Sequence, residues 1–206
     1  MSTAGHEHGK TFAGLVIEVV LITIGVFLAL LASNWHEDRE HRAQARAALR
    51  NFIGEMQANE QAVKQYRAYH ETLARELDLF LKSIEPMTNE RMKRQVHFEG
   101  VRPVIFEHTA WDLALATQAL SHVEPRLAFQ ISTVYTKQNA FQTLENSFLS
   151  SAFTPAGFSS NNPKGLATAI WTYLGDANHE EPLMLNLYAK TIPEIRRALT
   201  DTSAPQ

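Results

Sequence analysis

Residues 12–32 read FAGLVIEVVLITIGVFLALLA, and this stretch decides how the rest of the chain is interpreted. Fourteen of its side chains are Leu, Ile, Val or Phe, and only Glu18 and Thr23 are polar. At about 1.5 Å of rise per residue, a helix of this length measures roughly 32 Å, the thickness of a bilayer core. The apolar side chains outweigh the cost of about 3 kcal/mol for inserting one acidic residue. We therefore predict a transmembrane helix over residues 12–33, rather than a buried helix of a soluble protein.

The same stretch differs from a cleaved signal peptide. Its apolar run exceeds the roughly 7 to 15 residues of a signal peptide core, and no small-x-small cleavage site follows it. The helical pattern instead continues through Ser33, Asn34 and Trp35. The sequence thus predicts an uncleaved single-pass anchor in a lipid bilayer, after a short tail at 1–11. Trp35 is then an interfacial anchor of the kind found in aromatic belts.

One face of the predicted span collects its small residues together with its single carboxyl group. Gly25 and Ala29 form a small-xxx-small pattern, which lets two helix backbones approach closely. Glu18 and Ala32 fall on the same face, and carboxyl groups in spans usually face protein or water. We predict a membrane helix interface at this face, for a membrane protein partner or a second copy of the chain. The alternative is that Glu18 reaches the nearer lipid surface and that the small residues are incidental.

The charges that flank the span leave its orientation open. Arginines at 39, 42, 46 and 50 follow it, interleaved with acidic residues at 37, 38 and 40. Counting Lys and Arg favours a cytoplasmic location for the large domain, although long domains translocate regardless of such charges. The arginine stripe either attracts anionic lipid head groups or is a solvated helix face paired with the neighbouring acids.

The remainder of the chain is typical of a globular domain without a basic surface. The whole chain of 206 residues is 45% hydrophobic and 20% charged, with a net charge of −3 and no cysteine. This balance argues against a nucleic-acid partner. The absence of cysteine excludes disulfides, thiolate metal sites and cysteine nucleophiles.

A long juxtamembrane helix is predicted over residues 34–84. No proline occurs between Lys10 and Pro86, and apolar residues recur every three or four positions over about five heptads. Two polar residues, Asn59 and His70, fall on this seam. We expect the seam to pack within one bundle, with an intermolecular coiled coil as the alternative. Its apolar members are Leu49, Phe52, Met56, Val63, Tyr66, Leu73, Leu77, Phe80 and Ile84.

A connecting segment is predicted over 85–108, with a short helix near 89–94. The remaining helices of the bundle are expected within 109–200, before a frayed tail at 201–206. Thr109 and Asp112 resemble a capping box that opens a helix, and Pro125 suits the first turn of the next one. That helix is predicted to run to about 150, with core positions Leu127, Ile131, Tyr135, Phe141, Leu144 and Phe148.

Further along, glycine and proline predict several interruptions. Residues 151–164 read as a loop, and a short helix over 165–174 is expected to stop at Gly175. Pro182 is expected to open the last helix, and Pro193 to kink it or begin a new turn. No strand alternation competes with these helices. The predicted fold class is all-α, with an N-terminal transmembrane helix that continues into a long helix and an up-and-down helical bundle.

No motif for catalysis, cofactor binding or metal binding emerges. The nine histidines form neither H-E-x-x-H nor Glu-x-x-His, and Gly-rich phosphate loops and G-x-S-x-G are absent. We predict no catalytic, cofactor-binding or metal residue and no enzyme. A buried cluster of titratable groups outside these motifs would reopen that question. The candidate bundle pocket comprises Trp111, Thr117 and Gln118, near the 151–164 loop, although small residues around it also suit close helix packing.

The anchor and its exit resemble a bacterial family of uncharacterised single-pass inner-membrane proteins. The residues that carry the resemblance are Glu18, Gly25 and the sequence Asn34-Trp35-x-Glu37. A second similarity is Thr109-Ala-Trp-Asp-Leu-Ala followed by Gln118-Ala119-Leu120, with Gln118 where the family often has glycine. The resemblance implies a membrane-anchored helical domain of unknown function that faces the periplasm, and it supplies no activity.

Two functional hypotheses follow from these observations. In the first, the protein is a scaffold or accessory subunit that acts by protein–protein association. If its domain is periplasmic, about ten residues remain in the cytoplasm, so a signal has to pass laterally to a partner. In the second, the bundle binds a small ligand or envelope component and signals through a membrane partner. A cavity with convergent polar groups favours the second hypothesis, and a filled core favours the first.

Overall fold

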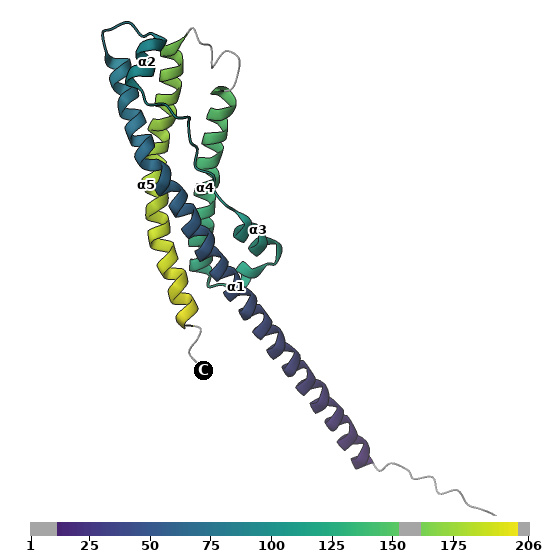
Figure 1. Ribbon diagram of the computed structural model, residues 1–206. Helices are drawn as coiled ribbons and strands as arrows, with labels where there is room; N and C mark the ends of the chain where they lie inside the picture. Colours follow the sequence, from purple (N-terminus) through teal and green to yellow (C-terminus); the bar gives the residue numbers. More distant parts are fainter. Residues whose placement is uncertain (1–11, 153–161, 202–206) are drawn as a thin grey trace, which may run out of the picture. The chain divides into compact units, whose positions relative to one another are not determined.

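The computed structural model describes residues 12–152 and 162–201, and their fold is all-α, as predicted (Figure 1). The predicted tail at 1–11, residues 202–206 of the predicted tail at 201–206 and most of the predicted 151–164 loop lie outside the described residues, whereas Asp201 is helical. Two compact units share the chain, one up to Gln44 and one from Ala45. The elements are α1 (Phe12–Lys82), α2 (Asn89–Gln95), α3 (Thr109–Ala116), the 3₁₀ helix η1 (Ala119–His122), α4 (Pro125–Ala152) and α5 (Pro163–Asp201).

The predicted long helix is one uninterrupted element, α1, which covers both the apolar stretch and the seam. Every apolar seam position from Leu49 to Phe80 is buried or half-buried, which confirms that the seam packs within the bundle. The prediction for Ile84 is wrong, because α1 ends at Lys82 and the Ile84 side chain is fully exposed. The predicted short helix near 89–94 is confirmed as α2, where the Thr88 hydroxyl accepts a hydrogen bond from the backbone N–H of Arg91.

Three long helices form the bundle of the second unit: residues 45–82 of α1, then α4 and α5 (Figure 1). Phe52 packs against Tyr135, which joins α1 to α4, and Phe148 stacks on Tyr173, which joins α4 to α5. His70 pairs with Glu181, which joins α1 to α5. Figure 1 shows α1 and α4 running in the same direction and α5 running back. The return between α1 and α4 is therefore made by the connection that contains α2, α3 and η1.

Extended chain between α2 and α3 lies along α1 and takes its hydrogen bonds from side chains. Asn59 donates to the Glu107 carbonyl at 2.9 Å and accepts from the Glu107 N–H at 2.8 Å. Tyr69 donates to the Gly100 carbonyl, and Glu76 accepts from the His97 N–H. A buried backbone without a strand or helix partner needs such acceptors and donors. This explains why polar residues such as Asn59 lie on an otherwise apolar seam.

The start of α3 is capped by a distant residue rather than by the predicted capping box. The N-cap residue is His108, Thr109 is already helical, and no local side chain caps the helix. Instead the buried Glu55 carboxylate on α1 accepts a hydrogen bond from the Ala110 N–H at 2.7 Å. A carboxylate at a helix N-terminus satisfies an unpaired donor and opposes the positive end of the helix dipole.

The predicted breaks at Gly175 and Pro182 are wrong, because α5 is one helix of 39 residues with both prolines inside it. Pro193 does not begin a new helix, and the alternative prediction of a kink there stays a prediction. An interior proline costs about 3 kcal/mol. The buried face outweighs this cost, because it continues at spacings of three and four on both sides of each proline. Its members are Ala167, Ile170, Tyr173, Leu174, Ala177, Glu181, Met184, Tyr188, Thr191, Ile192 and Ile195.

Candidate functional site

The first candidate site is the apolar part of α1. By length and composition this helix could cross a membrane, and none of its apolar window is buried inside the protein. Every residue from 14 to 40 is exposed, including Leu21, Ile22 and Phe27 at about 60%. A core helix of a soluble protein would be mostly buried. The described residues are thus compatible with one membrane-spanning helix.

The predicted interface residues Glu18, Gly25, Ala29 and Ala32 all lie on this exposed part of α1. No side chain lies within 4 Å of the position that a Cβ would take at Gly25, so the described protein itself does not fill this face. The role predicted for these four residues stays a prediction.

The flank that follows the span carries the predicted interfacial residue Trp35, which is 61% exposed, and Arg39 lies over its ring at 4.8 Å. Arg42 approaches Asp38 at 3.9 Å, and His36 pairs with Glu40 at 3.1 Å. Pairs at i and i+4 of this kind suit a solvated helix face. An interfacial role for Trp35 stays a prediction.

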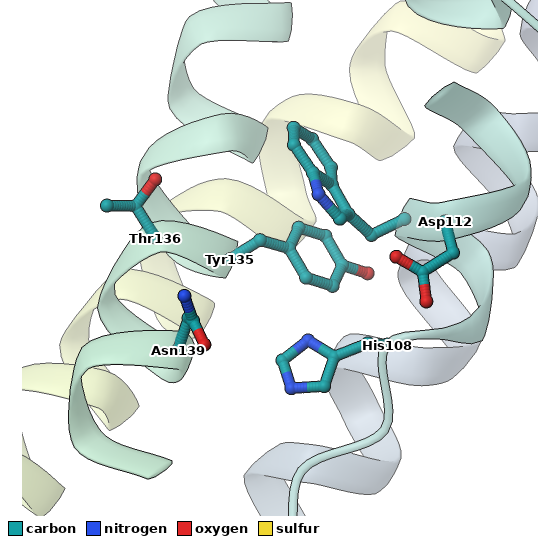
Figure 2. A pocket seen from close by; sticks show the side chains of 6 residues that line it. His108, Asp112, Tyr135, Thr136 and Asn139 are labelled. Atoms are coloured by element: carbon teal, nitrogen blue, oxygen red, sulfur yellow. The ribbon is translucent and has the colours of Figure 1, made fainter. Parts of the chain in front are cut away.

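A second candidate site is a hollow of about 430 Å³ on the bundle (Figure 2). Three elements supply its walls: the end of the extended chain, the first turn of α3 and the middle of α4. In Figure 2 the Tyr135 ring lies between Thr136 and Asn139 on one side and Asp112 and His108 on the other. The lining residues are His108, Trp111, Asp112, Tyr135, Thr136 and Asn139.

Buried contacts fix the aromatic wall of this hollow, which consists of Trp111 and Tyr135. The Tyr135 hydroxyl donates to Glu55 at 2.6 Å, and the same carboxylate caps α3. Burial, reinforced by the Glu55 carboxylate, raises the pKa of Tyr135, so its phenol stays protonated and remains a donor. Trp111 stacks on Tyr135 with ring centroids 4.9 Å apart and planes 21° apart. Glu55 therefore fixes α3 and Tyr135 together, and with them the aromatic wall.

The rim of the hollow is polar. Among the described residues, the side chains of His108, Asp112, Thr136 and Asn139 form no hydrogen bond with another part of the protein. No Lys or Arg lines the hollow, so Asp112 supplies its fixed charge. These groups converge on one space and are available to a ligand.

Sequence reasoning identified one of the six lining residues. Trp111 lines the hollow, whereas Thr117 and Gln118 are not among its lining residues, so a pocket role for these two stays a prediction. Both lie past the last turn of α3, where Gln118 adopts a left-handed conformation with φ of 56°. At the start of the predicted 151–164 loop, 16 residues of α4, about 24 Å, separate Tyr135 from Ser151, so the hollow does not lie beside that described part.

A third feature is a fully buried polar cluster, which the motif search did not find. His70 Nδ1 lies 2.5 Å from Glu181 Oε1, and both side chains are completely inaccessible. His70 Nε2 donates to the carbonyl oxygens of Arg102 at 3.0 Å and Val101 at 3.1 Å. Burial by itself would lower the pKa of His70, but the hydrogen bond and charge of Glu181 outweigh it and the pKa is raised. The geometry thus favours an imidazolium that donates from both ring nitrogens.

Glu145 extends this cluster onto α4. Its Oε1 accepts from the Val104 N–H at 2.8 Å and from the Tyr173 hydroxyl at 3.1 Å. Burial raises the pKa of the Glu145 carboxyl to about 7, although these hydrogen bonds oppose the rise. Tyr173 also packs edge-on against His70. All three long helices and the extended chain therefore meet at one ionisable cluster.

A sequence signal for this cluster did exist. Glu145 lies between Phe141 and Phe148, and Glu181 lies between Ala177 and Met184, each at the three- or four-residue spacing of a buried face. A carboxylate at such a spacing indicates a buried partner. Which residue is the partner depends on positions more than 100 residues apart, as for His70 and Glu181.

Substrates cannot reach the buried cluster in this structure. The side chains of His70, Glu145 and Glu181 are all inaccessible, so a reacting molecule cannot reach them. Within the described ranges, no group of three or more His, Asp or Glu side chains is arranged to hold a metal ion.

Taken together, these features define a class: an all-α protein with one candidate membrane-spanning helix and a helical bundle that carries a small polar hollow. Comparison of the chain with protein-family models, with curated proteins and with solved structures finds no match.

Proposed function

We propose that the protein is a single-pass protein of the bacterial inner membrane and acts through association with other membrane proteins, as a scaffold or accessory subunit. The observation that carries the proposal is the exposure of every residue from 14 to 32 on an unbroken helix that continues into the bundle. An exposed apolar surface of this length is unfavourable in water and is covered by lipid or protein.

The proposed contact surface within the bilayer is the face that carries Glu18, Gly25, Ala29 and Ala32. Lipid tails are as apolar as the span itself, so helix association there depends on close backbone packing and on interhelical polar contacts. Gly25 and Ala29 permit the close approach, and Glu18 offers a polar contact that is costly to leave in lipid. The partner is another membrane protein or a second copy of this chain.

Replacing Gly25 with isoleucine is expected to reduce association of the span by about tenfold in a membrane two-hybrid assay, because a branched side chain separates the backbones. Phe27→Ile, on the opposite face, is the matched control and should retain association. Extraction of vesicles with alkaline carbonate tests whether the full chain is anchored in the membrane. Release of the protein from the vesicles would contradict the proposed membrane anchor. If the protein is retained but G25I associates as well as the wild type, only the proposed helix interface is contradicted.

We further propose that the bundle faces the periplasm. This proposal follows the family resemblance, whereas the count of Lys and Arg beside the span favours the cytoplasm. An alkaline phosphatase fused after Gln206 is expected to be active, because this enzyme requires the oxidising periplasm. A green fluorescent protein at the same position should stay dark after export. Bright fluorescence with an inactive phosphatase would place the bundle in the cytoplasm.

A second candidate function is binding of a small ligand by the bundle, with occupancy signalled laterally through the span. The observation that favours it is the hollow beside Trp111, where four polar side chains converge on an aromatic wall. Most of the bundle core consists of apolar side chains, which suits the first function equally. Saturable binding of a small molecule to the hollow would distinguish the two.

A further inference from the structure

We propose that the hollow beside Trp111 binds a small organic cation, a protonated amine. This inference rests on the second candidate function and specifies the class of its ligand. Three observations carry it: the charge of the lining, the electronic state of the aromatic wall, and the unpaired polar groups on the rim.

The lining charge is negative. Asp112 is exposed on the first turn of α3, and no Lys or Arg lines the hollow. Beneath the wall lies the buried Glu55 carboxylate, bound to the Tyr135 hydroxyl. A carboxylate ligand would meet Asp112 without a compensating cation, whereas an ammonium group would form a charge-assisted hydrogen bond with it.

The aromatic wall also favours a cation. Trp111 and Tyr135 are stacked, and the ring of His108 lies 6.2 Å from that of Tyr135. The faces of Trp and Tyr attract cations within about 6 Å of the ring centroid. The Tyr135 hydroxyl donates to the Glu55 carboxylate, which makes its ring more electron-rich than a free phenol. Because Tyr135 is only 2% exposed, the half-buried Trp111 stacked on it supplies the face that a cation reaches.

The rim supplies acceptors for the N–H groups of a primary amine. The Thr136 hydroxyl and the Asn139 amide face the hollow from α4, across from Asp112 and His108 (Figure 2). A volume of about 430 Å³ is at the small end of ligand sites, so the ligand is a molecule of modest size.

The test uses the fluorescence of Trp111 in the full chain, with W35F and W171F introduced so that Trp111 is the sole reporter. The chain is titrated in detergent with phenethylamine, with the neutral 2-phenylethanol and with the anionic 3-phenylpropionate. Phenethylamine is expected to give a saturable change, with at least about tenfold tighter binding than the other two compounds. Calorimetry on the wild-type chain with the same compounds guards against an effect of the tryptophan replacements.

Asp112→Asn should weaken amine binding by about tenfold, because it removes the charge and preserves the shape. Asp201→Asn, which removes the same charge from an exposed position at the end of α5, should leave it unchanged. Equal binding of the alcohol and the amine, or of D112N and wild type, would overturn the cation assignment. Preferential binding of 3-phenylpropionate would also overturn the cation assignment, but it would support a ligand site in the hollow. If none of the three probes binds, both the cation assignment and the ligand site are refuted.

Discussion

Replacing His70 with leucine is expected to lower the free energy of unfolding of the bundle by about 3 to 5 kcal/mol. Glu181 would keep its buried position and lose the only hydrogen bond of its carboxylate among the described residues, because its Oε2 already has no partner there. The carbonyl groups of Val101 and Arg102 would lose their donor as well. The measurement is urea unfolding of the full chain in micelles, followed by circular dichroism.

Two comparisons make this prediction specific to the buried pair. The double variant His70→Leu/Glu181→Leu should recover much of the loss, because a buried ion pair replaced by apolar side chains is often neutral or stabilising. His97→Leu removes the His97–Glu76 pair, whose histidine side chain is 82% exposed, and should cost no more than about 1 kcal/mol. If H70L were as stable as H97L, the buried pair would not hold α1 to α5.

The second large effect is a fall in stability as the pH rises from about 5 to above 7. The pKa of Glu145 is about 7 in the folded bundle against an ordinary value of 4.5, so in this interval the folded state holds a proton that the unfolded state has lost. The pKa of His70 is raised too, which extends the fall above pH 6.5 in the same direction. From the Glu145 shift alone, the loss is on the order of 3 kcal/mol.

Glu145→Gln is expected to flatten the part of this profile between pH 5 and 7, because glutamine resembles the protonated carboxyl group and does not titrate. The midpoint of urea unfolding, measured at half-unit intervals of pH, gives the profile. Glu76→Gln is the control, since the pKa of Glu76 is lowered by its contacts with His97 and its titration lies below this interval. A wild-type profile that rises between pH 5 and 7, or an unchanged slope in E145Q, would contradict the prediction.

Both predictions concern residues whose position in the core was visible in the sequence while their role was not. His70 falls on the apolar seam of α1, so its burial could be predicted from periodicity. That it pairs with Glu181 and with the carbonyl groups of the extended chain could not, because these contacts join residues that only the complete fold brings together. Asn59 and Glu55 follow the same rule: each binds backbone groups about 50 residues away.

Of the residues that line the candidate hollow, only Trp111 was predicted from the sequence. Trp111 stood out as a large aromatic residue in a helix of small ones, but its neighbours Tyr135, Thr136 and Asn139 come from α4 and His108 from the extended chain. Sequence reasoning placed Thr117 and Gln118 beside it because they are close in sequence. They follow the end of α3, where Gln118 adopts a left-handed conformation, and neither is among the lining residues.

The sequence by itself determined the helical class, the apolar stretch of α1, and the extent of α1, α2 and α4 to within a few residues. These follow from local rules: the spacing of apolar side chains, and the effects of proline and capping residues on the backbone next to them. The tertiary structure alone decided that α5 continues through two prolines, that Glu55 caps α3, and that an ionisable cluster joins three helices. In each of these cases, burying side chains against distant partners contributes more free energy than the conformational preference of the local sequence. A local sequence pattern carries no information about those distant partners.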